Sequence, residues 1–189
     1  MRIISGKLKR KSIKFVKNSQ TRPLKDIVRE NIFNILKHSN LFNIKIENSN
    51  ILDLYSGIGS FGIECISRGA HKVTFIEKDK NSSNILKENL NKLSVQDKAL
   101  VISDQIENFL KKEKKRKEKF DLFFLDPPFT ENKFLQILNT IKKLEIYKSN
   151  HLIILHRERK TNDNFDTLIN VIDYKIYGRS KIIFGLFSE

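Results

Sequence analysis

Hydrophobic and polar positions along the chain follow two alternating patterns. Short apolar runs recur, and between them lie longer segments in which apolar residues return every three or four positions. The runs predict strands at 51–54, 72–77, 99–103, 120–125 and 151–155, with a closing pair at about 168–177 and 181–187. The longer segments predict helices that begin at 22–23, directly after a glycine turn near 60, and at 81–93, 104–117 and 134–144.

This alternation indicates an α/β fold. Strands that are each followed by a helix form a mostly parallel sheet with helices on both faces. The last two predicted strands are joined by Gly178 and Arg179, a connection short enough for a tight turn, so one closing strand should be antiparallel. Near the start, the segments 2–5 and 12–16 flank a basic stretch and predict a small hairpin or an extended arm.

Composition excludes several classes of protein. The chain has 189 residues, of which 39% are hydrophobic and 10% aromatic, too many for a disordered chain and enough for one domain with a real core. The apolar runs are far shorter than the roughly 18 residues of a membrane span. The single cysteine, Cys65, cannot form an internal disulfide or a multi-cysteine metal site. We expect a monomeric cytoplasmic protein with no metal ion.

The net charge of +14 is concentrated in two stretches. Residues 1–25 hold nine basic residues and no acid, residues 111–119 hold seven basic and two acidic residues, and the remainder is neutral. The first stretch predicts an arm that contacts RNA phosphates, ahead of a core at 26–189. The second is interpreted as a solvated helix end, with RNA contact as its alternative. The predicted phosphate contacts are Arg2, Lys7, Lys9, Arg10, Arg22 and Arg29, although Arg29 could instead pair with Asp26.

A glycine turn follows the first predicted strand of the sheet. In the segment DLYSGIGSFG, Gly57 and Gly59 allow a tight turn and a close approach of backbone to a ligand. Glu77 ends the next strand, where a carboxylate can bind both hydroxyls of a ribose. A dinucleotide fits this pattern too, but Asp53 would lie beside its anionic pyrophosphate. S-adenosylmethionine (SAM), with its ammonium and sulfonium groups, suits that carboxylate better.

Two further residues complete the predicted cofactor site. Asp104 follows the third strand, where it can meet the amino group of adenine. Tyr55 could flank the cofactor, although packing explains it equally well. The alternative for the whole turn is a structural one without a ligand. Because acids end three successive strands around one turn, we favour a SAM site.

A DPPF tetrapeptide follows the predicted strand at 120–125. An exocyclic amine on a base is a poor nucleophile, and acceptors for its two N–H groups free its lone pair. Asp126 offers one acceptor and the Pro127 carbonyl a second, while Pro128 stiffens the turn and Phe129 can stack on an extruded base. Alone, the tetrapeptide would fit a loop that merely ends a strand. Together with the glycine turn, it predicts a SAM-dependent amino-methyltransferase.

The motifs carry a resemblance to a known family. The DPPF motif occurs in many DNA and RNA amino-methyltransferases, whereas RIISGKLK, TRPLKDIVRENIFNIL (21–36) and CISRGA (65–70) are more specific. With these segments, nearly the whole chain resembles the RsmD family of bacterial 16S ribosomal RNA guanine-N2 methyltransferases. Lys25, the YGRS turn at 177–180 and the dense 111–119 run depart from the family pattern, which leaves the RNA contacts open.

The resemblance implies a seven-stranded Rossmann-like class I methyltransferase fold with a small basic extension. It implies SAM bound by Asp53, Gly57, Gly59, Glu77 and Asp104, and methylation of a guanine N2, by family precedent that of guanine 966, in 16S ribosomal RNA. The substrate would be that RNA, within an assembling small subunit. Two alternatives remain: an adenine-N6 or other DPPF-type enzyme, and an RNA-binding module that has lost catalysis. The segment 156–159 follows the carboxyl end of a predicted strand and could touch substrate, but a polar loop is the favoured interpretation.

Overall fold

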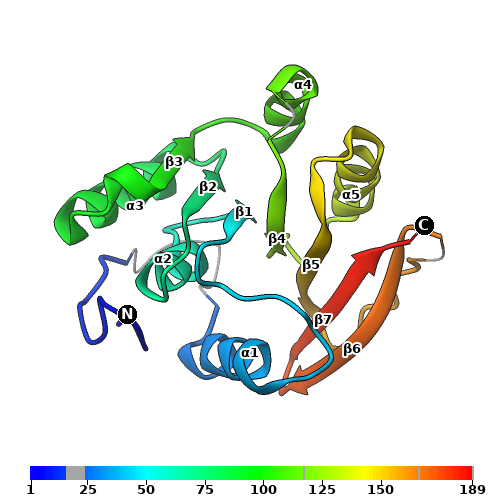
Figure 1. Ribbon diagram of the computed structural model, residues 1–189, viewed down its shortest axis with the longest axis horizontal. Coiled ribbons are helices and arrows are strands. Elements are labelled where there is room, and N and C mark those ends of the chain that lie inside the picture. Colours follow the sequence, from blue (N-terminus) through cyan, green and yellow to red (C-terminus); the bar gives the residue numbers. More distant parts are fainter. Residues whose placement is uncertain (16–23, 117, 166, 189) are drawn as a thin grey trace.

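A computed structural model of the protein describes residues 1–15, 24–116, 118–165 and 167–188. Its centre is one seven-stranded sheet in the order β3-β2-β1-β4-β5-β7-β6 (Figure 1). The strands are β1 (Asn50–Leu54), β2 (Lys72–Ile76), β3 (Ala99–Ile102), β4 (Phe120–Leu125), β5 (Tyr147–Glu158), β6 (Ile169–Tyr177) and β7 (Ser180–Phe187).

The five strands β1 to β5 are parallel, and β7 runs antiparallel to both β5 and β6. The predicted mostly parallel sheet with an antiparallel closing strand is confirmed. The main difference is β5, which extends well beyond the predicted 151–155 because β7 continues to pair with it as far as Glu158. Three of the four residues predicted as a polar loop, 156–158, therefore belong to this strand.

Helices cover both faces of the sheet, as predicted, and each face has its own hydrophobic core (Figure 1). On one face Phe33 stacks on Phe61, which stacks on Phe124 of the sheet. The first of these two faces carries α1 (Asp26–His38), α2 (Ser60–Ser67) and α3 (Lys80–Leu93), and the other carries α4 (Ile106–Arg116) and α5 (Lys133–Leu144).

Two helix starts differ from the prediction. The first helix begins at Asp26, after non-helical Leu24 and Lys25, and not at Arg22-Pro23, which lie outside the described residues. The fourth begins at Ile106 because Asp104 turns its carboxylate onto the backbone N–H of Gln105 and so precedes the helix. Within the described ranges, none of the helices is long and apolar enough to cross a bilayer.

The N-terminal segment forms a small hairpin against α2. Arg2 and Ser12 form an antiparallel bridge, which confirms a hairpin over an extended arm. The buried Glu64 of α2 holds the hairpin, because its two carboxylate oxygens accept the backbone N–H groups of Ile4 and Ser5 at 2.8 and 2.9 Å. Gly6 is required at the contact, since a Cβ there would lie only 1.9 Å from the Ser67 carbonyl oxygen.

Candidate active site at the carboxyl ends of the parallel strands

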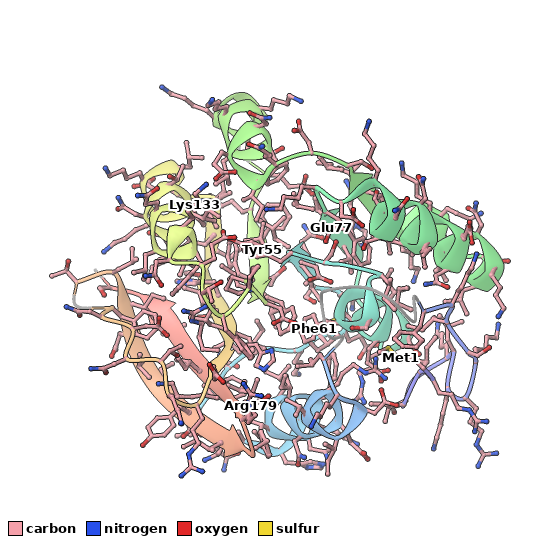
Figure 2. The ribbon with its side chains drawn as sticks, turned by 180° about the vertical axis from the view of Figure 1, so that it is seen from behind. Met1, Tyr55, Phe61, Glu77, Lys133 and Arg179 are labelled. Carbon is pink, nitrogen blue, oxygen red and sulfur yellow. The ribbon has the colours of Figure 1, made fainter. Side chains whose placement is uncertain are left out.

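The predicted site residues follow the carboxyl ends of four neighbouring parallel strands. The register aligns these ends, because Leu54 of β1 lies opposite Ile76 of β2 and Leu125 of β4. Tyr55 and Glu77 therefore leave adjacent strands at one edge of the sheet (Figure 2). This edge is where α/β sheets bind ligands, since each strand turns there into the amino end of a helix.

The glycine turn after β1 bends back on Glu77. The backbone N–H of Gly57 donates to the Glu77 carboxylate at 2.7 Å, which links the turn to the end of β2. Gly57 and Gly59 have φ angles of 53° and 83°, in the left-handed region that favours glycine. A Cβ on Gly57 would meet no atom within 4 Å, so its backbone faces open space that a ligand can occupy. At Gly62 a Cβ would lie 2.2 Å from the Phe75 ring, which explains the third glycine.

Asp53 lies beneath this turn and is almost fully buried, with 1% of its surface exposed. One carboxylate oxygen, Oδ2, accepts the backbone N–H of Gly62 at 3.0 Å, while Oδ1 is buried and meets no hydrogen-bond donor among the described residues. Burial raises the pKa of Asp53 well above its ordinary value, and the nearby charges of Asp126 and Glu77 raise it further. A buried, unpaired carboxylate oxygen in an acidic site favours a cationic ligand.

The other two predicted cofactor residues lie at the rim of the site. Asp104 is partly exposed, and hydrogen bonds from the Asn108 side chain and the Gln105 backbone lower the pKa of its carboxyl group. Tyr55 has a left-handed φ of 61° and donates its hydroxyl to Glu131 at 3.0 Å. Because Glu131 follows the DPPF segment, this bond ties the two predicted motifs together. Burial and the Glu131 charge raise the pKa of Tyr55, so the hydroxyl keeps its proton.

The DPPF segment turns away from β4 with its Asp126 side chain held by His156. Asp126 Oδ1 lies 2.8 Å from His156 Nδ1, and His156 Nε2 lies 2.9 Å from the Ser180 hydroxyl. A carboxylate oxygen only accepts, so Nδ1 carries a proton, and Nε2 is hydrogen-bonded to the Ser180 hydroxyl. The Phe129 ring meets the His156 ring edge-on, with centroids 5.4 Å apart. The hydrogen-bonded series Asp126–His156–Ser180 thereby fixes Oδ1 of Asp126, while Oδ2 meets no hydrogen-bond donor among the described residues.

Arg157 fixes the second half of the DPPF segment, Pro128 and Phe129, through hydrogen bonds to their backbone. Its guanidinium donates to the carbonyl oxygens of Pro128 and Phe129 at 3.3 and 3.2 Å, and it forms an ion pair with Asp163 at 3.0 Å. The side chain is 1% exposed and packs over the Phe134 ring. The Pro127 carbonyl, in contrast, meets no hydrogen-bond donor in the described part of the chain, so it can accept from a substrate.

The sequence pattern favours a polar loop for His156 and Arg157 because it ends the strand at 155. The hydrophobic run stops there, and a His-Arg-Glu-Arg segment is typical of a polar loop. Their position in the sequence is the signal that places them near the site. Residues that follow the carboxyl end of a parallel strand lie at the same end of the sheet as Asp126. Their interpretation as a polar surface loop is wrong, because both side chains are buried.

Of the six predicted phosphate contacts, four are exposed, one is buried and one lies outside the described residues. Arg2, Lys7, Lys9 and Arg10 are exposed on the hairpin, whereas Arg22 lies outside the described residues. Arg29 is 1% exposed and donates to the Arg2 carbonyl at 2.6 Å and to Asp26 at 3.0 Å. Its guanidinium therefore supports the hairpin and does not face solvent; the alternative pairing with Asp26 is the one that forms.

Other candidate residues take structural positions. Cys65 is fully buried in α2, as predicted, and burial raises the pKa of its thiol. His151 accepts the backbone N–H of Phe187 at 2.9 Å inside the sheet. Over the described ranges, no group of three or more His, Cys, Asp or Glu side chains is arranged to hold a metal ion.

Comparison with known proteins identifies the family. The family model described as "Conserved hypothetical protein 95" matches residues 1–185. The chain belongs to this family. It is the RsmD family that the motifs resemble, and that prediction is confirmed. Two relatives named "Ribosomal RNA small subunit methyltransferase D" are each 34% identical: that of Haemophilus influenzae over 94% of this chain and 93% of its own, and that of Buchnera aphidicola (strain Bp) over 100% and 92%.

Solved structures agree with the family and the fold. The Escherichia coli protein yhhF, described as a methyltransferase, has a TM-score of 0.82 at 25% identity and covers 100% of this chain and 98% of its own. The Haemophilus influenzae protein HI0767, described as a "putative methylase", has a TM-score of 0.76 at 29% identity, with the same coverage. The RsmD fold is thus a class I methyltransferase fold, as predicted.

Proposed function

We propose that this member of the RsmD family transfers a methyl group from SAM to the N2 amine of a guanine in 16S ribosomal RNA, at the position of guanine 966. The observation that carries the proposal is the fixed Asp126 carboxylate beside the free Pro127 carbonyl, two acceptors on one turn. The relatives named small subunit methyltransferases support the choice of RNA. No feature of the described residues favours adenine or DNA over it.

The residues present fit SAM. Asp53 offers a buried, unpaired oxygen to a cation, Gly57 offers open backbone, and Glu77 lies at the end of β2, where ribose hydroxyls are bound in this class of fold. We assign Asp104 to binding of the adenine amino group. Tyr55 and Gly59, both in the glycine turn, are assigned to the walls of the cofactor site. When bound, SAM supplies an electrophilic methyl group on its sulfonium.

The chain contributes positioning and hydrogen-bond acceptors to the reaction. Asp126 Oδ2 and the Pro127 carbonyl accept the two N–H groups of the amine, which makes the nitrogen pyramidal and frees its lone pair for in-line attack. Phe129 stacks on the extruded base and excludes water from the amine. After transfer, one amine proton leaves by way of Asp126 Oδ2 or a water molecule. His156 and Arg157 keep both acceptors in place throughout.

Binding of the RNA backbone is assigned to the exposed side of the hairpin. Arg2, Lys7, Lys9 and Arg10 are exposed there, and the buried Glu64 and Arg29 fix the hairpin against the catalytic domain. A docked hairpin binds RNA with less loss of entropy than a free arm. The proposed partner is an assembling small ribosomal subunit in the bacterial cytoplasm, and the proposed state of the enzyme is a monomer.

The test is a methylation assay on 16S RNA that lacks this modification. Small subunits and naked 16S RNA from cells without the gene are incubated with purified enzyme and labelled SAM, and the product is mapped by mass spectrometry of nuclease digests. We expect one N2-methylguanine, formed faster on whichever form is the natural substrate. Methylation only of adenine, or only of DNA, would contradict the proposal, and absence of SAM binding by calorimetry would support a purely RNA-binding module.

A further inference from the structure

A strip of apolar side chains is exposed on β6, away from the catalytic residues. Val171, Tyr174 and Ile176 are 39, 57 and 44% exposed, and they form half of the large hydrophobic residues that are exposed in the described ranges. The helices α4 and α5 cover the central strands on this side of the sheet, whereas these three side chains of β6 stay exposed (Figure 1). Exposed apolar surface of this kind is typical of binding sites.

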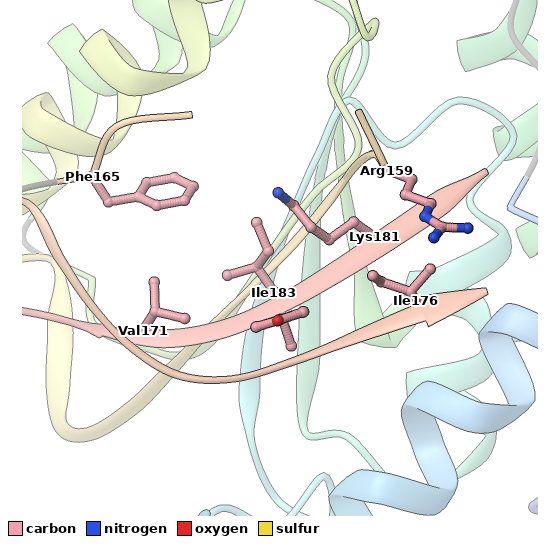
Figure 3. A pocket seen from close by; sticks show the side chains of 7 residues that line it. Arg159, Phe165, Val171, Ile176, Lys181 and Ile183 are labelled. Carbon is pink, nitrogen blue, oxygen red and sulfur yellow. The ribbon is translucent and has the colours of Figure 1, made fainter. Parts of the chain in front are cut away.

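The strip forms the floor of a groove on the β6–β7 hairpin (Figure 3). Cross-strand pairs put Tyr174 beside Ile183 and Ile176 beside Lys181, so their side chains share one face. The groove is lined by Arg159, Phe165, Val171, Tyr174, Ile176, Lys181 and Ile183. Two of these residues are cations and none is an acid. Figure 3 shows Arg159 and Lys181 toward one end and Phe165 and Val171 toward the other.

The cationic end of the groove adjoins the catalytic turn. Lys181 lies directly opposite Arg157 in the β5–β7 ladder, and Arg157 is the residue that binds the carbonyl oxygens of Pro128 and Phe129. One residue earlier, Ser180 of β7 contacts His156. The groove therefore begins one strand away from the place assigned to the target base.

We propose that this groove binds the single-stranded nucleotides that flank the target guanine, an inference that rests on the proposed RNA methylation. The exposed Tyr174 ring offers a stacking surface for a base, and the aliphatic side chains beside it offer an apolar floor. Arg159 and Lys181 meet the phosphates between the target and the stacked nucleotide. An extruded guanine leaves its neighbours unstacked, and the groove gives one of them a new stacking partner.

The structure favours RNA over a second copy of the chain as the occupant. A symmetric dimer through this face would bring Arg159 and Lys181 of both copies into one interface without an acid lining it, which costs free energy. Extension of the sheet at β6 is also disfavoured, because a bulge between Val171 and Asp173 breaks the regular ladder of this edge strand.

The experiment compares variants of the full-length enzyme in RNA binding and in methyl transfer on a 16S RNA fragment with the target guanine. Tyr174→Ser should weaken binding about 5- to 50-fold and raise KM with little change in kcat, whereas Tyr174→Phe should retain near wild-type affinity because the ring remains. Arg159→Gln should lower the slope of log Kd against log salt by about 0.7. Lys143→Gln is the matched control, an exposed cation in the last turn of α5 that does not line the groove.

The outcomes separate this inference from the proposed function. If the wild-type enzyme methylates the fragment but Tyr174→Ser and Arg159→Gln bind it as the wild type does, the groove inference is wrong and the function stands. If ultracentrifugation shows a dimer that Tyr174→Ser dissociates while RNA affinity is unchanged, the groove binds a second copy instead. If the wild type transfers no methyl group to guanine, the function fails, and weaker RNA binding by Tyr174→Ser still supports the groove.

Discussion

Replacement of Asp126 by Asn should abolish most of the catalytic power without loss of shape. His156 Nδ1 donates to Asp126 Oδ1 at 2.8 Å, so in Asp126→Asn the single amide oxygen turns toward His156 to keep that bond. The amide nitrogen then occupies the place of Oδ2 and presents its own N–H groups to the substrate amine. The variant thus replaces an acceptor by a donor at the reacting nitrogen. The side chain is 23% exposed, so the exchange itself costs little stability.

The magnitude follows from the loss of one charge-assisted hydrogen bond that forms in the transition state. Removal of such a group from a water-excluded site typically lowers kcat about 100- to 1,000-fold, or about 2.7–4 kcal/mol. Single-turnover methyl transfer with excess enzyme and labelled SAM on unmethylated small subunits measures this step directly. Calorimetric SAM affinity should change by less than a few-fold, because Asp126 is not assigned to the cofactor.

The control is Asp121→Asn, the same substitution at the other end of β4. Asp121 pairs with Lys148 at 2.8 Å and accepts the Asn50 backbone N–H, so the change affects local stability and not the site. We expect its single-turnover rate to stay within about threefold of wild type. A rate for Asp126→Asn within tenfold of wild type would refute the acceptor role and indicate that positioning by the Pro127 carbonyl and Phe129 suffices.

Three further predictions concern the cofactor turn and the hairpin. The pKa of Asp53 is raised in the folded protein, so its ionisation destabilises the fold as pH rises above the ordinary carboxyl range. Asp53→Asn should therefore raise Tm more at pH 8 than at pH 5, and it should weaken SAM binding. An equal gain in Tm at both pH values would contradict this. Glu64→Ala leaves two backbone N–H groups without acceptors and should cost about 2–4 kcal/mol, with faster hydrogen exchange at Ile4 and Ser5 and weaker RNA binding. Gly59→Ala should cost at least about 1–2 kcal/mol, measured by chemical denaturation, because a φ of 83° strains any residue with a Cβ and that Cβ would lie 2.3 Å from the buried Leu86 side chain.

Much of the fold follows from the sequence because its strands are buried on both sides. Runs such as FDLFFL at 120–125 have few polar interruptions, and each is followed by a helix with a clear apolar stripe, so element type and order were predicted correctly. Boundaries that depend on tertiary pairing were not. The strand β5 continues to Glu158 only because β7 pairs with it there, and no local pattern records that partner.

The candidate site shows the same division between local and long-range information. Asp53, Glu77 and Asp126 are predicted from local signals, because each lies at or directly after the end of an apolar run. The burial of Arg29 could not be predicted, because it depends on a hairpin that folds back from 27 residues away to cover the guanidinium. Burial lowers the pKa of Arg29, and its contacts with Asp26 and the Arg2 carbonyl offset that cost.

The antiparallel strand β7 connects these observations to function. In an all-parallel sheet, the strand next to β5 would bring its carboxyl end to the site edge and continue into a helix. Because β7 runs the other way, its first residues lie there instead. Lys181 lies opposite Arg157 in the ladder, and the Ser180 hydroxyl contacts the His156 ring. One reversal in strand direction thus supplies the partner that orients the Asp126-bound histidine and places a cation where the proposed RNA groove begins. The closing strand, which the sequence pattern identifies only as structural, thus contributes residues to the candidate active site.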